Sequence, residues 1–136
     1  MQRLFVDTSA WFAFANRADP DHKTVAALLA AFKGRLVTSN FVFDETVTLC
    51  LHRLGHAAAG RVGQALRDSG QVDLVRVAPE DETAAWQLFR ERSDKQYSFT
   101  DCTSFALMRR LDLKVAAALD DDFAGKGFEQ LPLLPR

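Results

Sequence analysis

Hydrophobic positions along the chain follow two patterns, and each pattern predicts a type of secondary structure. Short continuous apolar runs, such as residues 4–6, are typical of strands buried on both faces of a sheet. Apolar residues spaced three and four apart predict amphipathic helices, which end at glycines such as Gly34 and Gly55. The predicted strands are residues 4–6, 36–37, 74–77, 115–119 and 128–131, and the predicted helices are residues 25–32, 41–54, 58–66, 79–89 and 98–111.

The order of these elements predicts the fold class. Strands alternate with helices from end to end, which favours an α/β fold with one open parallel sheet, covered by helices on both faces in a Rossmann-like three-layer arrangement. The 136 residues predict a single domain over residues 1–136, because domains usually contain roughly 100–200 residues. We find no internal repeat, linker-like stretch or low-complexity segment that would divide the chain.

Composition and charge exclude several classes of protein. The formal net charge of −1 excludes the strongly basic surface of a DNA-coating protein, although acids gathered in one site would mask basic residues around it. Cys50 and Cys102 lie in apolar helical stretches, which predicts buried free thiols in a reducing compartment. No apolar stretch approaches the roughly 20 residues of a membrane span, and Asp7 interrupts the first apolar run in a way that signal peptides do not. We therefore expect a cytoplasmic protein.

Four acidic residues stand where the predicted fold would bring them together. Asp7 follows the first strand and Asp120 follows the fourth, and open parallel sheets bind ligands beyond the carboxyl ends of their strands. Asp101 lies in the first turn of a helix that opens with the S-x-x-D pattern of a capping box. Glu45 lies inside a helix with apolar residues one turn away on both sides, so its carboxylate needs a proton, an ion pair or a cation.

Convergence of these four carboxylates would require their charge to be compensated. Either their pKa values rise or a metal ion neutralises them, and ligands that are all oxygen suit Mg²⁺ or Mn²⁺ rather than Zn²⁺. Such sites cut phosphodiesters by activating a water molecule. Each acid also has a structural interpretation: Asp7 as a helix cap, Asp101 as a partner of the helix dipole, Glu45 as a solvated side chain, and residues 120–122 as a solvated loop.

Four segments, in this order, resemble a known family. They are residues 4–10 (LFVDTSA), Asn40 with Glu45, residues 98–102 (SFTDC) and residues 119–123 (LDDDF). Together they resemble the PIN-domain ribonucleases, and most of all the VapC-type toxins of bacterial toxin–antitoxin pairs, over nearly the whole chain. The resemblance implies a PIN-like fold, an Mg²⁺- or Mn²⁺-dependent endoribonuclease acting on RNA, a homodimer, and a cognate antitoxin protein whose C-terminal segment blocks the acidic crevice.

The resemblance also assigns residues. The catalytic, metal-binding acids of the family fall on Asp7, Glu45, Asp101 and Asp120. Asp120 is preferred to its neighbours because the last acid of the family lies three residues before a Phe, and Asp122 is a secondary metal ligand. Asp44 leaves open which acid faces inward, since adjacent helical side chains diverge by about 100°. The supporting residues implied are Ser9 and Thr100, which would hold carboxylates or metal-bound water, and Asn40, whose role is either in the site or structural.

Other interpretations remain beside this one. A phospho-acceptor domain would carry an acidic pair after the first strand, whereas Asp7 stands alone there. A degenerate PIN domain that only binds a partner is a stronger alternative. His52 and His56 are four residues apart with Gly55 between them and no third ligand, which favours surface histidines. The sequence also lacks the glycine-rich motifs that bind nucleotides.

Two further groups of residues have a possible role in RNA binding. The basic residues of a candidate RNA track are Arg53, Arg61, Arg67, Arg90, Arg92, Lys95, Arg109 and Arg110, most of which we expect to be ordinary solvated charges. Trp11, Phe12 and Phe14 cluster after the first strand, where core or oligomer packing is the preferred interpretation over base stacking.

Overall fold

A five-stranded parallel sheet forms the centre of the computed structural model, which describes residues 2–91 and 95–132. The strands lie in the order β3-β2-β1-β4-β5, and every neighbouring pair is parallel. Their bounds are β1 (Arg3–Val6), β2 (Arg35–Ser39), β3 (Val72–Val75), β4 (Val115–Ala117) and β5 (Glu129–Leu131). Because β1 lies between β2 and β4, the strand order reverses there. The crevice in which open α/β sheets bind ligands therefore lies beyond the carboxyl ends of β1 and β4.

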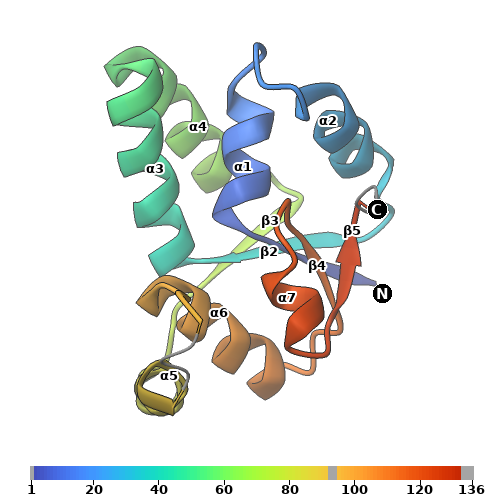
Figure 1. The fold of residues 1–136 in the computed structure, drawn as a ribbon. Helices are drawn as coiled ribbons and strands as arrows, with labels where there is room; N and C mark the ends of the chain where they lie inside the picture. Colours follow the sequence, from blue (N-terminus) through green and yellow to red (C-terminus); the bar gives the residue numbers. More distant parts are fainter. Residues whose placement is uncertain (1, 92–94, 133–136) are drawn as a thin grey trace.

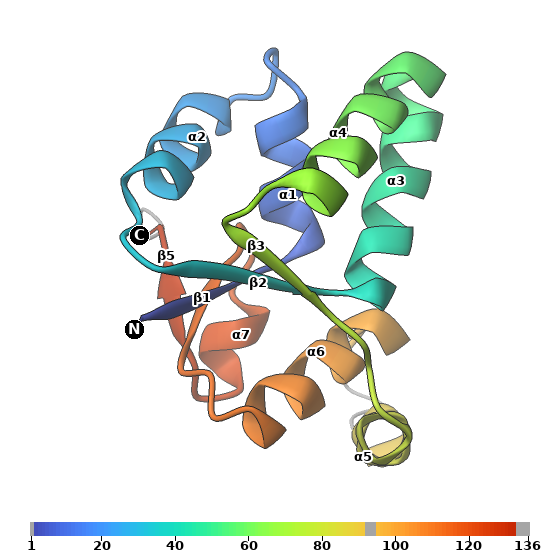
Figure 2. The same ribbon diagram turned by 180° about the vertical axis from the view of Figure 1, so that it is seen from behind.

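Helices cover both faces of this sheet (Figure 1, Figure 2). One face carries α1 (Thr8–Ala15), α2 (His22–Ala31), α3 (Asn40–Leu54) and α4 (His56–Asp68). The other face carries α6 (Phe99–Arg110) and the short α7 (Asp122–Gly125), and α5 (Pro79–Glu91) packs against α6 on the outside. The expected α/β class with one open parallel sheet is confirmed.

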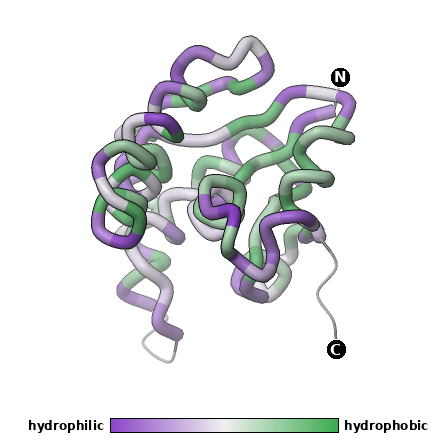
Figure 3. The backbone as a smooth tube through the Cα atoms, turned by 90° about the horizontal axis from the view of Figure 1, so that it is seen from above, coloured by the Kyte–Doolittle hydropathy of each residue, from purple (hydrophilic) through white to green (hydrophobic). Residues whose placement is uncertain are grey.

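The hydrophobic core surrounds the central strands. Figure 3 shows how apolar and polar stretches alternate along the backbone. Leu4, Phe5 and Val6 of β1 are fully buried, as expected for a strand covered on both faces. Phe123 of α7 packs edge-on against Phe105 of α6 and also contacts Phe5 of β1, which fixes α7 to the sheet. Within the described residues, no helix combines the length and the hydrophobicity needed to cross a membrane.

Some element boundaries differ from those predicted. Helix α1 was not predicted, because its sequence TSAWFAFA is apolar on nearly all sides and carries little helical periodicity. Strand β3 covers residues 72–75 rather than 74–77, in register with residues 36–39 of β2. Strand β4 ends at Ala117, so Asp120 follows it after two intervening residues instead of directly. The loop expected after residue 120 contains α7.

Candidate active site

Asp7 occupies the carboxyl end of β1 and is 4% exposed. Its Oδ2 accepts hydrogen bonds from the backbone N–H of Ser9 at 3.2 Å and from the Ser9 hydroxyl at 2.8 Å, so the predicted role as a helix cap is confirmed. Its Oδ1 is buried and has no hydrogen-bond partner within the described part of the chain. Because an unpaired buried carboxylate oxygen is costly, this atom points to a ligand.

The pKa values of two acids show that the carboxylates influence one another. The pKa of Asp7 is raised from 3.8 to about 7, mainly by burial, with a contribution from the negative charges of Asp101 and Asp120, while the Ser9 hydrogen bonds oppose the rise. Burial likewise raises the pKa of Asp101 to about 6, and the charges of Glu45 and Asp120 act in the same direction. The four acids predicted from the sequence therefore share one electrostatic environment.

Asp101 is held at the start of α6 by a capping box. The Ser98 hydroxyl accepts a hydrogen bond from the backbone N–H of Asp101 at 3.0 Å, and Asp101 Oδ2 accepts one from the backbone N–H of Ser98 at 3.0 Å. The predicted capping box is thus present, and it orients the same carboxylate that lies in the acidic site.

Glu45, rather than Asp44, faces the site. Both residues lie in α3, but Asp44 is exposed whereas Glu45 is half-buried. Glu45 is among the charges that raise the pKa of Asp101. Since Thr46 and Val42 beside it belong to the buried face of α3, Glu45 lies at the edge of that face, and its charge acts on Asp101 in the first turn of α6.

The charge of Asp120, rather than that of Asp122, affects the pKa values of the other acids of the site. Asp120 raises the pKa values of both Asp7 and Asp101. The pKa of Asp122 is raised mainly by burial and also by Asp120 and Asp121, while Lys95 lowers it. Asp120 Oδ1 accepts a hydrogen bond from the backbone N–H of Asp122 at 3.0 Å, so Asp120 also fixes the turn that leads into α7.

Gln130 of β5 holds this acidic loop and was not foreseen from the sequence. Its buried side-chain amide donates hydrogen bonds to the carbonyls of Ala118, at 3.2 Å, and Asp120, and its oxygen accepts one from the backbone N–H of Ala124 at 3.1 Å. A polar residue inside the predicted strand of residues 128–131 was the only available signal, and it does not show which loop the amide contacts.

The supporting residues have different roles. The Ser9 hydroxyl, which donates to Asp7, also accepts a hydrogen bond from the backbone N–H of Leu119 at 3.1 Å, so it ties β1 to the loop of the fourth acid. Asn40 Oδ1 accepts one from the backbone N–H of Val77 at 2.7 Å, which is a structural role. The carbonyl of Thr100 accepts hydroxyl hydrogen bonds from the next turn of α6, and its own hydroxyl makes no contact that links it to the acids in the described structure.

The donor set fits a divalent cation. Among the described residues, no three His, Cys, Asp or Glu side chains are arranged as a ready-made metal site, so the acids are neighbours rather than a formed cage. The unpaired Asp7 Oδ1 and the raised pKa values of Asp7 and Asp101 are what a cation would relieve. Because the candidate ligands are all oxygens, hard cations such as Mg²⁺ or Mn²⁺ fit better than Zn²⁺.

Comparison with known protein families agrees with this geometry. The PIN domain family model matches residues 4–129. The chain belongs to the PIN-domain family. All four acids of the site, from Asp7 to Asp120, lie inside the matched part of this PIN domain.

Relatives of this PIN domain are named as ribonucleases. It is 40% identical over 128 residues to the 23S rRNA-specific endonuclease VapC20 of Mycobacterium tuberculosis, covering 94% of this chain and 97% of that protein. The crystal structure of that VapC20, described as a Sarcin-Ricin loop cleaving toxin, matches with a TM-score of 0.87 over 92% of this chain and 95% of the other. A VapC ribonuclease of Archaeoglobus fulgidus is 30% identical over 115 residues, 81% of this chain and 72% of that protein.

The fold extends to more distant structures. VapBC2 from Rickettsia felis, bound to a DNA fragment from their promoter, matches this PIN domain with a TM-score of 0.69 at 9% identity, over 95% of this chain and 97% of that one. At that identity the likeness shows the fold alone.

The remaining candidates of the PIN domain lie outside the acidic site. His52 and His56 are exposed. Trp11 is buried and donates a hydrogen bond to the Thr38 hydroxyl at 3.2 Å, so it belongs to the core as preferred. Cys50 and Cys102 are free and buried, as expected.

Several basic residues of the candidate RNA track have protein partners. The guanidinium of Arg67 lies over the ring of Phe43 and that of Arg109 over the ring of Phe128, while Arg110 pairs with Asp81 at 2.8 Å. Arg92 lies outside the described residues.

Proposed function

We propose that this PIN domain is an Mg²⁺- or Mn²⁺-dependent endoribonuclease and the toxin of a toxin–antitoxin pair. The observation that carries the proposal is the electrostatic coupling of Asp7, Glu45, Asp101 and Asp120 beyond the ends of β1 and β4. The 40% identity to a 23S rRNA-specific endonuclease supports RNA as the substrate class. We further propose that the whole chain, residues 1–136, acts as one nuclease domain.

The residues of the site prepare it for hydrolysis of a phosphodiester. Asp7, Asp101, Asp120 and Glu45 would hold the cation, with Asp122 as a secondary ligand. When bound, a divalent cation lowers the pKa of an attacking water and stabilises negative charge on the leaving oxygen. Ser9 fixes Asp7 Oδ2 and leaves Oδ1 for the ligand.

Protons should compete with the cation for these carboxylates. With pKa values of about 7 for Asp7 and about 6 for Asp101, protons compete for the site in mildly acidic solution. Cation binding should therefore release protons, and cleavage should weaken as the pH falls below about 6.

The proposed partners follow from the family. They are a cognate antitoxin that covers the acidic crevice and a second copy of the chain in a homodimer, and the proposed location is the cytoplasm. The buried free thiols of Cys50 and Cys102 suit a reducing compartment. Light scattering of the purified protein measures the oligomeric state directly.

Mapping of new RNA 5′ ends in cells that express the protein tests the proposed function. The wild type should create ends at defined RNA positions, and the Asp101→Asn variant, expressed at the same level, should create none. Ends that appear equally with both proteins, or with neither, would favour the alternative of a PIN domain that only binds a partner.

Separate substitution of Asp120 and of Asp122 tests which of these acids serves as the fourth ligand. Asp120→Asn should reduce RNA cleavage more than Asp122→Asn, because Asp120 acts on both Asp7 and Asp101 whereas the acidic neighbours of Asp122 are Asp120 and Asp121. Initial cleavage rates at saturating Mg²⁺ give the comparison. The opposite order would move the fourth ligand to Asp122.

A further inference from the structure

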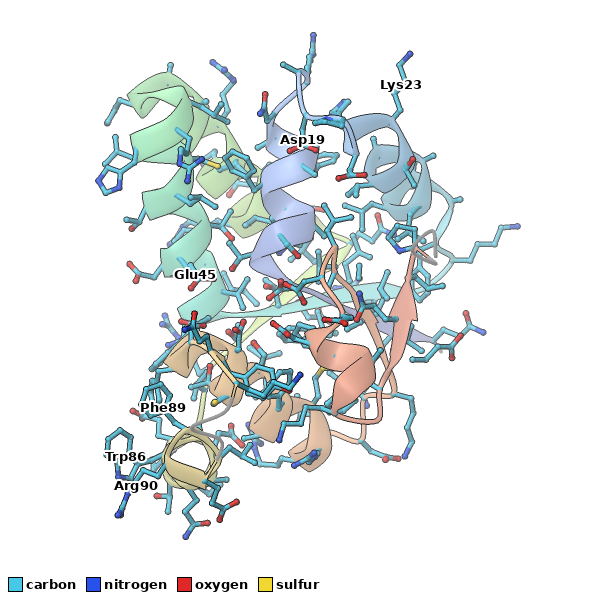
Figure 4. The ribbon with its side chains drawn as sticks, in the orientation of Figure 1. Asp19, Lys23, Glu45, Trp86, Phe89 and Arg90 are labelled. Carbon is cyan, nitrogen blue, oxygen red and sulfur yellow. The ribbon has the colours of Figure 1, made fainter. Side chains whose placement is uncertain are left out.

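Two large aromatic side chains lie exposed on α5. Trp86 is 53% exposed and Phe89 is 43% exposed, and their rings stack with centroids 5.8 Å apart and planes 11° from parallel. Figure 4 shows both side chains with Arg90 on the outer side of α5, on the side of the molecule where Glu45 lies in α3. We call Trp86 and Phe89 the aromatic platform.

The packing of α5 uses only part of the platform, because both rings contact Phe99 of α6 while about half of each side chain stays exposed. The helix buries Ala85 and Asp81 against the rest of the protein, and Asp81 forms an ion pair with Arg110 of α6. Trp86 and Phe89 are three residues apart and so lie on one side of the helix, beside the buried face. A pair of large aromatic side chains that stays this exposed is typical of a binding site.

Ring contacts connect the platform to the acidic site. The ring of Phe99 lies 6.4 Å from that of Trp86 and 6.5 Å from that of Phe89, centroid to centroid. Phe99 begins α6 two residues before Asp101, and its ring also lies 6.1 Å from that of Phe41, one helical turn before Glu45. A nucleic acid whose phosphate lies at the acids would therefore reach the platform within a few nucleotides.

Area and chemistry favour a nucleotide base over a protein partner. The exposed parts of two such side chains amount to roughly 200 Å², since a whole aromatic side chain presents about 150–250 Å². A stable protein interface needs about 800 Å² from each partner. The other large apolar side chains exposed in the described structure, Phe14 and Leu51, lie on α1 and α3 and do not extend the platform. Its flat ring pair beside a guanidinium suits a base and its phosphate.

We propose that the aromatic platform stacks an unpaired base of the RNA substrate next to the acidic site. The proposal rests on the proposed function and narrows its substrate class, because only bases outside a regular duplex can be stacked on protein rings. RNA loops, bulges and single strands are then the preferred substrates.

Tryptophan fluorescence tests this proposal directly, because Trp86 is exposed whereas Trp11, the other tryptophan, is 2% exposed. The experiment uses the Asp101→Asn variant, so that RNA is bound without being cut. A short single-stranded RNA should quench the fluorescence, and the same strand in a perfect duplex should quench it much less. The added change Trp86→Leu should remove the quenching and raise the Kd for the single strand about tenfold. Phe89→Leu should raise the Kd by a similar factor.

Two matched variants separate stacking from general effects. Trp86→Phe keeps a ring and should keep most of the affinity while losing the signal. Leu51→Ala alters a side chain that is 43% exposed, like Phe89, but lies on α3, and it should leave the Kd unchanged. The melting temperature of each variant confirms that it is folded.

Several outcomes would overturn the proposal. Absence of quenching by single-stranded RNA, or an unchanged Kd in folded Trp86→Leu, would exclude base stacking on the platform. A change in oligomeric state on Trp86→Leu with unchanged RNA affinity would assign the platform to a protein interface. Cleavage by the wild type without quenching would support the nuclease and contradict the platform. Quenching by single-stranded RNA, combined with the absence of new RNA 5′ ends in cells that express the wild type, would support the platform and contradict the nuclease.

Discussion

Asp101→Asn should lower the rate of RNA cleavage by at least about 100-fold while leaving the protein folded. Loss of a group that merely orients a metal ligand costs 10–100-fold, so loss of a ligand should cost more. The amide oxygen of Asn can still accept the hydrogen bond that Asp101 Oδ2 takes from Ser98, so the capping box at the start of α6 should survive. The measurement is the initial rate with saturating Mg²⁺, together with the melting temperature.

Neighbouring acids of α3 provide the matched control. Glu45→Gln should reduce cleavage by a similar order, because Glu45 faces Asp101, whereas Asp44→Asn removes the same charge from an exposed position and should change the rate by less than about twofold. If both α3 variants lose activity equally, general electrostatics rather than a ligand set would explain the effect. If Asp101→Asn keeps its activity, the site assignment is wrong.

The sequence was sufficient to predict the fold class and the edge of the sheet at which the acids meet. Strand β1 is recognisable because a strand covered on both faces must be continuously apolar, and α3 ends at Gly55, which has a φ of 96° that favours glycine. The carboxyl ends of β1 and β4 then place Asp7 and Asp120 near one another, since both strands are parallel and adjacent. Periodicity predicts the strands and the acids that follow them, whereas the adjacency of β1 and β4 is known from the structure.

Features that depend on contacts between distant residues could not be predicted in this way. The choice between Asp44 and Glu45 needs the rotation of α3 about its axis, which is set by packing rather than by the spacing of its apolar residues. The contact of Gln130 with the carbonyl of Asp120 joins β5 to the acidic loop, and no local pattern marks it. Helix α1 also escaped prediction, because burial on most sides removes the polar face that gives a helix its pattern.

Asp7→Asn should stabilise the protein at pH 7 and above when divalent cations are removed with a chelator. The folded-state pKa of Asp7 is about 7, against an ordinary value of 3.8, so between these values the folded state binds more protons than the unfolded state. The free energy of unfolding of the wild type should therefore be unaffected by Asp7 below pH 4, fall as the pH rises from about 4 to 7, and then level off. At 1.36 kcal/mol per pKa unit, the loss reaches at most about 4 kcal/mol.

Asn at position 7 removes this charge and its cost. Its amide group, however, places N–H donors beside the buried position of Oδ1, where Asp7 has no partner in the described structure, and this offsets part of the gain. We therefore expect a net gain of about 1–3 kcal/mol at pH 7.5 and a flatter pH dependence, measured by urea unfolding from pH 5 to pH 8. The rise in the pKa of Asp101 to about 6 acts in the same direction in both proteins, so some slope should persist in Asp7→Asn.

Restoring the cation should reverse the order of the two proteins. A ligand that binds only the folded state stabilises it, so millimolar Mg²⁺ or Mn²⁺ should raise the free energy of unfolding of the wild type at pH 7.5, and it should raise that of Asp7→Asn much less. The combination is diagnostic, because Asn caps a helix about as well as Asp. If Asp7 were only a cap, the free energy of unfolding of Asp7→Asn would respond to the cation as strongly as that of the wild type. Equal cation effects on both proteins would show that Asp7 is a helix cap and not a cation ligand. A variant that is less stable than the wild type in chelator at pH 7.5 would show that the buried charge of Asp7 does not destabilise the fold.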